Sequence, residues 1–336
     1  MNNKIGVLLV NLGSPLSPSP KDVYRYLIEF LTDARVMDLP WWKRQLIVRG
    51  FIVPQRYRQS AKLYQQIWTD QGSPLIVHGY SVRDQLQTKL GEGYEVALAM
   101  RYQHPSIRQG LDQLRKKQVG ELIVLPLFPQ YASATTGSIY QKVMEEIGSW
   151  QSMPSLRFIS NFADEPHFIQ ALAERGRQYE LTRYDHILFS FHGLPEKQIV
   201  KGSPSHTCLS ESCCFSRNKG NQLCYKAQCY ATSRALVEAL ALKPGQFTLC
   251  FQSRLGNDPW IKPYASDVLK ECAEKGYKNI LVFSPSFVAD CLETISEIGH
   301  EYAEEFRRFG GQRLDLVEGL NAHPSWIEAL KSLVIQ

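Results

Sequence analysis

The chain of 336 residues lacks any stretch close to the roughly 18 uninterrupted apolar residues of a membrane-spanning helix. It also lacks the pattern of a signal peptide, because the first apolar run ends in turn residues after Asn11 instead of at a small-residue cleavage site. Low-complexity segments are absent, and 22 glycines and 18 prolines exclude a collagen-like or largely disordered chain. These absences predict a globular protein of the cytoplasm.

Four common site motifs are missing as well. The chain has no GxGxxG, no P-loop lysine motif, no GxSxG and no HExxH, which excludes the usual nucleotide, hydrolase and zinc-protease sites. Lys and Arg exceed Asp and Glu by 38 − 33 = +5. This small excess suits an anionic small molecule or a membrane surface and gives no reason to expect a nucleic-acid partner.

What the chain does contain is an alternation of short apolar runs with longer helical patterns, which predicts an α/β fold. The length suggests two domains, and the motif order repeats, since "LLVNLGSP" resembles "ILFSFHGLP" and "LIVLPLFPQY" resembles "ILVFSPSFVAD". We expect two similar doubly wound lobes, residues 1–154 and 155–336, each with a parallel sheet flanked by helices. The six expected strands are residues 5–11, 95–100, 121–127, 185–191, 247–251 and 279–283.

Two sets of side chains could carry chemistry at strand ends. His192 follows an apolar strand and precedes Gly193, where an imidazole can accept a proton or bind a metal; alternatively, it only hydrogen-bonds its own turn. The segment "ADCLETISEIGHEYAEEF" would place acids on one helical stripe, namely Asp290, Glu293, Glu297, Glu301 and Glu304. Such a stripe is either a solvated helix face or a set of oxygen ligands for a transiently held divalent metal such as Fe2+.

The segment from Leu39 to Pro54, "LPWWKRQLIVRGFIVP", combines paired tryptophans and bulky aliphatics with Lys43, Arg44 and Arg49. We call residues 39–54 the lip. Such a segment either docks on a membrane surface or guides an apolar acidic ligand, or it forms a helix packed on its own lobe.

Five of the eight cysteines lie close together, at Cys208, Cys213, Cys214, Cys224 and Cys229. Four thiolates can bind zinc or hold a 2Fe-2S cluster, and the adjacent Cys213 and Cys214 compete for one place. Disulfides are the alternative, disfavoured in a reducing compartment.

Seven ordered motifs together resemble the ferrochelatase family: "LLVNLGSP", "FLTDARVMDLP", "GSPL", "LFPQYASATTGS", "SFHGLPEK", "CFQSRLGNDPW" and "DCLETISEI". The resemblance runs from about Gly6 to the end of the chain. It implies two Rossmann-like lobes and a lyase that inserts Fe2+ into protoporphyrin IX to form protohaem, the terminal step of haem biosynthesis.

The same resemblance implies roles for individual residues. His192 and Glu293 look like the catalytic pair, and His192, Glu293 and Glu297 look like ligands of the substrate iron. The residues that resemble the porphyrin pocket are Arg56, Tyr64, Ser73, Arg101, Tyr102, Tyr131 and Trp260. One position departs from many members, because Cys291 stands where they have a histidine two residues before the helix glutamate.

The cysteine insert, residues 203–229, resembles the internal segment of some bacterial members that carry a 2Fe-2S cluster, with zinc as the alternative. The expected partners are protoporphyrin IX and Fe2+, with a peripheral contact to the inner membrane surface. The alternative functions are a chelatase for coproporphyrin or another tetrapyrrole, and a non-catalytic tetrapyrrole or metal carrier. No feature of the sequence specifies an oligomeric state.

Overall fold

The computed structural model describes residues 4–203, 208, 211–254, 256 and 258–336, so part of the cysteine insert lies outside the described residues. The chain divides into two compact units. Unit 1 comprises Met1–Phe128, Ala132–Ser160 and Ile327–Gln336, and unit 2 comprises Pro129–Tyr131 and Asn161–Trp326. The lobe boundary expected at residue 154 stays a prediction, because a compact contact unit is not by itself an independently folding domain.

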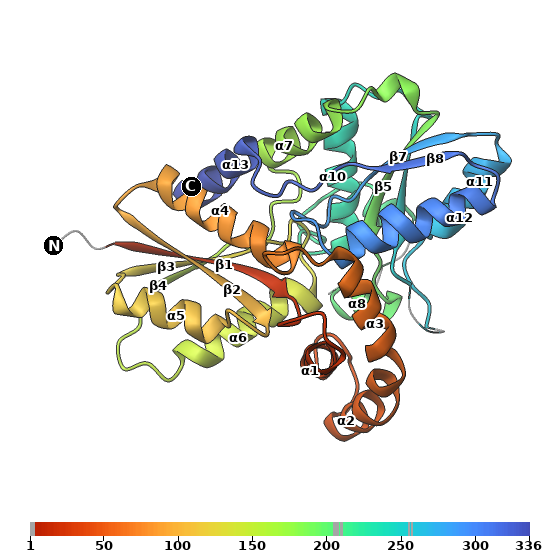
Figure 1. Ribbon diagram of the computed structural model, residues 1–336. Helices are drawn as coiled ribbons and strands as arrows, with labels where there is room; N and C mark the ends of the chain where they lie inside the picture. The colour runs from red at the N-terminus through yellow and green to blue at the C-terminus, as the bar shows by residue number, and fades with distance from the viewer. Residues whose placement is uncertain (1–3, 204–207, 209–210, 255, 257) are drawn as a thin grey trace. The chain divides into compact units, whose positions relative to one another are not determined.

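Unit 1 is built on a four-stranded parallel sheet in the order β2-β1-β3-β4 (Figure 1). Its strands are β1 (Ile5–Gly13), β2 (Tyr94–Tyr102), β3 (Glu121–Pro126) and β4 (Ser155–Phe158). The first three follow the apolar runs expected to be buried on both faces, as parallel strands covered by helices are. The short edge strand β4 was not predicted.

Helices cover both faces of this sheet. Leu8 and Val10 of β1 pack against α5 (Ile107–Lys116) and α6 (Ser138–Ile147) in one buried core. Helix α4 (Pro74–Leu90) covers the other face, where Gly79 lies against Leu98 and Met100. The remaining helical segments of unit 1 are α1 (Pro20–Leu31), α2 (Trp41–Ile47), the π-helix η1 (Val48–Ile52), α3 (Val53–Ile67) and the π-helix η2 (Ser133–Gly137).

Unit 2 repeats the same strand order, β6-β5-β7-β8, with every pair parallel. Its strands are β5 (His186–His192), β6 (Phe247–Gln252), β7 (Asn279–Phe283) and β8 (Arg313–Leu316). The repeated order confirms the predicted fold of two doubly wound α/β lobes. Because all strands of a parallel sheet end at the same edge, residues after β5, β6 and β7 gather at one edge of unit 2.

The sheet of unit 2 is also covered on both faces. One core joins Leu188 of β5 and Val282 of β7 to α11 (Ala265–Glu274), to the π-helix η4 (Glu293–Tyr302) and to α12 (Ala303–Arg308). On the other face, Gly176 of α7 (Pro166–Arg177) lies against Phe283, and α7 packs on α10 (Tyr225–Ala239). The other helical segments are η3 (Leu181–Arg183), α8 (Glu196–Lys201), α9 (Glu211–Cys214) and α13 (Pro324–Ile335), whose residues from Ile327 belong to unit 1.

No helix in the described part of the chain is long and apolar enough to cross a membrane.

Candidate functional site

His192 is the last residue of β5, and its hydrogen bonds define which ring nitrogen is available. Its Nδ1 lies 2.6 Å from the carbonyl oxygen of Gly193, a contact that places the ring proton on Nδ1. Nε2 is then left with a lone pair. The backbone carbonyl of His192 accepts a hydrogen bond from Tyr225 (2.7 Å), and the ring is flanked by Trp260 and Phe287 at centroid distances of 6.5 and 6.2 Å. The half-buried imidazole is therefore held in a fixed position with one basic nitrogen.

The turn after His192 is closely packed, which explains its glycine. The amide of Gly193 donates to the carbonyl of Gln252 at 2.8 Å, and a Cβ at residue 193 would lie 2.7 Å from that oxygen and 3.1 Å from the Trp260 ring. The next residues pair with the Trp260 segment, since Ile261 donates to the carbonyl of Leu194 at 3.0 Å. The HGLP motif thus places the buried Trp260 indole beside His192.

Glu293 is the first residue of η4 and is half-buried. Burial raises the pKa of Cys291, and the neighbouring Glu293 carboxylate raises it further, so this thiol stays protonated and donates a hydrogen bond to Glu293. The backbone carbonyl of Glu293 accepts a hydrogen bond from Nε2 of Gln252 at 3.1 Å. Cys291 is therefore a neighbour of the candidate catalytic carboxylate.

Glu297 has a carboxylate that four protein donors already engage. Oε1 accepts from the Ser253 amide (2.7 Å) and the Tyr302 hydroxyl (3.1 Å), and Oε2 accepts from the Ser253 hydroxyl (2.6 Å) and Gln252 Nε2 (3.2 Å). The iron-ligand role expected for Glu297 stays a prediction, and this arrangement favours an anchoring role instead.

The acidic stripe expected on an α-helix needs correction, because Glu293–Tyr302 is a π-helix with i→i+5 hydrogen bonds. Asp290 precedes this helix, and its carboxylate accepts hydrogen bonds from the Gly319 amide and the Asn321 side chain. Glu301 is exposed as a residue, but its carboxyl group is partly buried. This partial burial raises the pKa of Glu301, and the negative charges of Glu297 and other acidic neighbours raise it further. π-Helical segments are rare in proteins, and those that occur are often found at functional sites. The presence of η4 therefore supports a functional role for this segment.

In unit 1, two of the expected porphyrin residues belong to one polar cluster. Arg101 and the Tyr102 hydroxyl both bond Asp33 Oδ2, at 2.6 and 2.9 Å, and Ser138 adds a third bond at 2.5 Å. Burial raises the pKa of Asp33, but the Ser138 hydrogen bond, the Arg35 amide and the Arg101 charge outweigh it and hold the pKa below its usual value. Asp33 was not predicted, because an aspartate in "LTDARVM" looks like an ordinary helix-end residue.

The other expected porphyrin residues differ in accessibility. Arg56 on α3 is exposed, whereas Tyr64 on α3 and Ser73 before α4 are buried. Tyr131, in unit 2, is half-buried, and its amide donates to Gln228 at 2.6 Å. Tyr102 is completely buried, so we regard it as support for Arg101 and Asp33 rather than as a contact surface.

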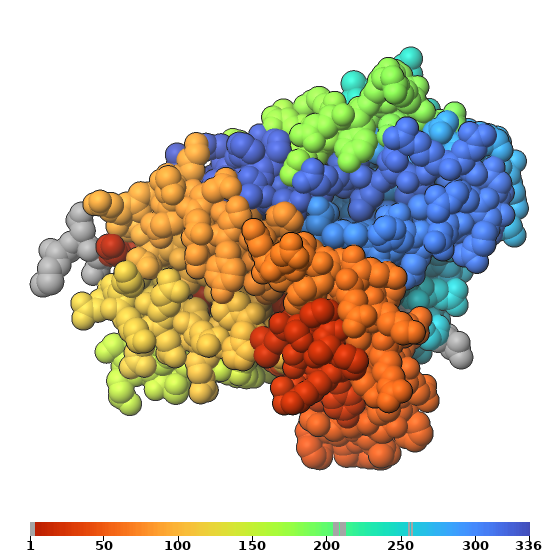
Figure 2. Space-filling view, in the orientation of Figure 1, coloured from red at the N-terminus to blue at the C-terminus, as the bar shows by residue number. Residues whose placement is uncertain are grey.

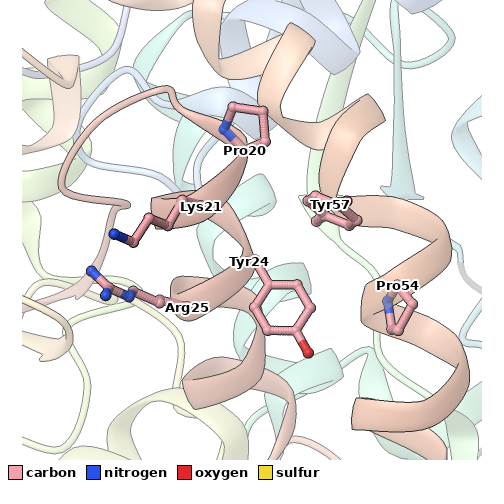
Figure 3. Close-up of a pocket in the computed structure, with 6 residues that line it drawn as sticks. All are labelled: Pro20, Lys21, Tyr24, Arg25, Pro54 and Tyr57. Atoms are coloured by element: carbon pink, nitrogen blue, oxygen red, sulfur yellow. The ribbon is translucent and has the colours of Figure 1, made fainter.

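A pocket in unit 1 lies between α1 and α3 and contains none of the expected catalytic residues. Tyr24 turns toward α3, with its ring perpendicular to that of Tyr57 at a centroid distance of 5.5 Å, while Lys21 and Arg25 point away from α3 (Figure 3). The lining residues are Pro20, Lys21, Tyr24, Arg25, Pro54 and Tyr57.

Two of the clustered cysteines, Cys214 and Cys224, are joined by a hydrogen bond between their side chains. A hydrogen bond from Cys214 lowers the pKa of Cys224 to about 6. The backbone amides of Lys226 and Ala227 at the start of α10 lower it as well, whereas burial acts in the opposite direction and raises it. Cys229 is completely buried, and Cys208 and Cys213 are half-buried. Within the described residues, no three His, Cys, Asp or Glu side chains are arranged to hold a metal. The donor chemistry suits a 2Fe-2S cluster or zinc, but this arrangement does not form a four-thiolate site.

Comparison with known sequences gives a consistent result over nearly the whole chain. A family model described as Ferrochelatase matches residues 4–336. A ferrochelatase of Legionella pneumophila (strain Philadelphia 1) is 45% identical over 329 residues, which cover 98% of each chain. A ferrochelatase of Coxiella burnetii (strain Dugway 5J108-111) is 44% identical over 335 residues, which cover 99% of this chain and 93% of the relative.

Comparison with solved structures supports the fold. SirB from Bacillus subtilis with Fe3+ aligns with a TM-score of 0.54 at 13% identity, covering 99% of this chain and 94% of that chain. The sirohydrochlorin chelatase SirB from Bacillus subtilis subspecies spizizenii, in complex with cobalt, aligns with a TM-score of 0.52 at 11% identity and the same coverage. At these identities the similarity concerns the two-lobed chelatase architecture alone.

Proposed function

The chain belongs to the ferrochelatase family, whose members are lyases that insert Fe2+ into a porphyrin, and we propose that its own substrate is protoporphyrin IX. The reaction exchanges Fe2+ for the two N–H protons of the free porphyrin, so it requires a proton acceptor, a route for a desolvated cation and a surface that holds a flat ring.

His192 fits the proton acceptor, and this is the observation that carries the proposal. Its Nδ1 is committed to the Gly193 carbonyl, so Nε2 can take a pyrrole proton without a change of tautomer. Trp260 and Phe287 flank the ring and limit its rotation. A base held at a strand end in this way is positioned before substrate arrives, which lowers the entropic cost of proton transfer.

Glu293 fits the second role, that of a carboxylate that replaces water around Fe2+ and receives protons. Its main chain is linked to the strand pair of His192 through Gln252, and the Cys291 thiol donates to its carboxylate. A single oxygen ligand holds Fe2+ weakly compared with a closed metal site, which suits an ion that must be passed on. We propose His192 and Glu293 as the catalytic pair and as the contacts of the substrate iron.

For the porphyrin, we propose Trp260, which unlike Tyr102 keeps some exposed surface (8%), as the aromatic contact. We propose Arg56 and Arg101 as partners for the propionates. Arg56 is exposed, and Arg101 retains partial exposure beside Asp33. An aromatic surface can hold the ring in a buckled form closer to the transition state than the relaxed substrate.

The test of the substrate is anaerobic Fe2+ insertion with protoporphyrin IX and coproporphyrin III in separate assays and in direct competition. We expect a higher kcat/KM for protoporphyrin IX. A preference for coproporphyrin would leave the metal insertion intact but overturn the substrate, and binding of both without turnover would identify a carrier.

We propose that the lip is a peripheral membrane contact on the cytoplasmic surface. Its side chains Trp41 (71% exposed), Trp42 (59%), Leu46 (59%) and Phe51 (58%) face solvent. They belong to α2 and η1, a segment that lies at the surface of unit 1 (Figure 2). Residues 39–69 contain six basic and no acidic side chains, a pattern that favours anionic lipid. Arg44 is not available for this role, because its guanidinium donates to the carbonyls of Thr32 and Leu39.

For the cysteine insert, we propose a 2Fe-2S cluster with ligands among its five thiols, and zinc as the alternative. The lowered pKa of Cys224 makes one thiolate available to a metal, because a thiolate is the form that ligates. The hydrogen bond to Cys224 raises the pKa of Cys214, and burial raises that of Cys229, so these two thiols would have to lose their protons on metal binding. No catalytic step is assigned to this group. A visible spectrum of anaerobically purified protein with iron-sulfur bands supports the cluster, and a colourless protein with bound zinc overturns it in favour of zinc.

A further inference from the structure

Gln252 is a buried glutamine at the junction of the two elements that carry the candidate catalytic pair. Gln252 is the last residue of β6, and only 1% of its surface is exposed. In the parallel pair of β5 and β6, Gln252 is the register partner of His192, and its carbonyl accepts the amide hydrogen of Gly193. Its backbone therefore belongs to the strand pair that ends at His192.

The side chain of Gln252 reaches the other element. Its Oε1 accepts a hydrogen bond from the Ser190 hydroxyl on β5 at 2.9 Å. Its Nε2 donates to the Glu293 carbonyl at 3.1 Å and to Glu297 Oε2 at 3.2 Å, both on η4. One amide thus uses its acceptor on the strand and its two N–H groups on the π-helix.

This set of partners requires a glutamine. A glutamate would present an acceptor to the Glu293 carbonyl and the Glu297 carboxylate, which are both acceptors. An asparagine is one methylene shorter and cannot span the same two elements. A methionine has a similar length but leaves the buried Ser190 hydroxyl and two partly buried oxygens, of Glu293 and Glu297, without this partner. The loss of a hydrogen-bond partner is costly for polar groups in a protein interior.

We propose that Gln252 is a positioning residue for iron insertion, because its amide fixes the first turn of η4, with Glu293, against the strand end that carries His192. This inference rests on the proposed roles of His192 and Glu293. A displacement of about 1 Å between reacting groups can lower a rate about a hundredfold. The loss of Gln252 should therefore reduce turnover while porphyrin binding remains.

The experiment compares Gln252→Met with a matched control, Thr248→Val. The control removes a partly buried hydrogen bond of the same strand pair, that between Thr248 and His186 at 2.8 Å, at the opposite end of β6. Porphyrin stoichiometry and Kd are measured by fluorescence quenching, and kcat by anaerobic Fe2+ insertion. We expect Gln252→Met to bind protoporphyrin IX with unchanged stoichiometry and a Kd within about twofold, but to lose about 10- to 100-fold in kcat. The control should keep both properties.

Two outcomes overturn the inference. One is a kcat of Gln252→Met within about twofold of wild type; the other is a loss of binding-competent protein in proportion to the loss of turnover, which indicates a structural role alone. If Gln252→Met yields no folded protein, Gln252→Asn takes its place with the same expectations.

His192→Ala and Glu293→Gln are assayed alongside. Retained turnover in those two variants contradicts the proposed function, whereas their inactivity beside an active Gln252 variant contradicts only this inference.

Discussion

The carboxylate of Glu297 accepts two hydrogen bonds from Ser253, one from its amide and one from its hydroxyl. Its Oε1 accepts the backbone amide hydrogen of Ser253 at 2.7 Å, and its Oε2 accepts the hydroxyl hydrogen of the same residue at 2.6 Å. Ser253 follows β6 directly and has a φ of 65°, a left-handed conformation that is uncommon outside glycine. Two charge-assisted hydrogen bonds thus stabilise an unfavourable turn next to Gln252.

From this contact we predict that Glu297→Gln affects stability more than iron affinity. The variant places an NH2 group where a carboxylate oxygen faced donors, so the free energy of unfolding should fall by about 1–3 kcal/mol, while KM for Fe2+ stays within about twofold. Urea denaturation and initial rates at varied Fe2+ measure the two quantities, with Glu304→Gln, an exposed residue of α12, as the control. A large rise in KM for Fe2+ at unchanged stability would instead identify Glu297 as an iron ligand.

A second prediction concerns Asp33, whose pKa in the folded protein is below its usual value of 3.8. The stabilisation from this carboxylate is present above that value and is lost as the pH falls through the folded-state pKa. At pH 7, Asp33→Asn should lower the free energy of unfolding by about 2 kcal/mol, because Arg101 loses its ion-pair partner and keeps only the Ser138 hydroxyl. The difference from wild type should shrink as the pH falls below about 4.

Denaturation curves at several pH values test this expectation. Asp84→Asn is the control, because its ion pair with Arg83 is exposed and should contribute little. A difference for Asp33→Asn that is independent of pH would contradict the stated role of the charge.

A third prediction concerns the lip. Trp41→Ala combined with Trp42→Ala should lower partitioning onto phosphatidylglycerol vesicles by at least about tenfold, because two exposed indoles lose their contact with the bilayer interface. Co-sedimentation measures this effect. The control replaces Met144 and Met153, exposed apolar residues outside the lip, with alanine. Equal binding of all three proteins, or no preference for anionic over phosphatidylcholine vesicles, would be inconsistent with a membrane contact here.

Much of the fold could be predicted because buried parallel strands appear in a sequence as short apolar runs. The runs at Ile5, Glu121 and Asn279 begin strands β1, β3 and β7. Strands β4 and β8 could not be found in this way. Each has four residues and includes a charged side chain, Arg157 in one and Asp315 in the other, as is common for edge strands.

The candidate site was less predictable, because its key features depend on long-range contacts. Apolar periodicity does not distinguish a π-helix from an α-helix over ten residues, and the partners of Glu297 on the β6 side come from residues 44 and 45 positions away. Gln252 resembles an ordinary polar residue at the end of a strand, and only its burial and three partners reveal its position. His192 was easier to identify, because the strand and the Gly193 turn are adjacent in the sequence.

We propose that His192 accepts protons during metal insertion, and the most direct test is His192→Ala in an anaerobic Fe2+ insertion assay with protoporphyrin IX. Haem absorbance and porphyrin fluorescence are followed together, with His300→Ala, an exposed histidine of η4, as the control. We predict that His192→Ala loses at least about a hundredfold in kcat while its porphyrin binding and Tm match wild type. Turnover within about tenfold of wild type would contradict the assignment of His192 as the proton acceptor.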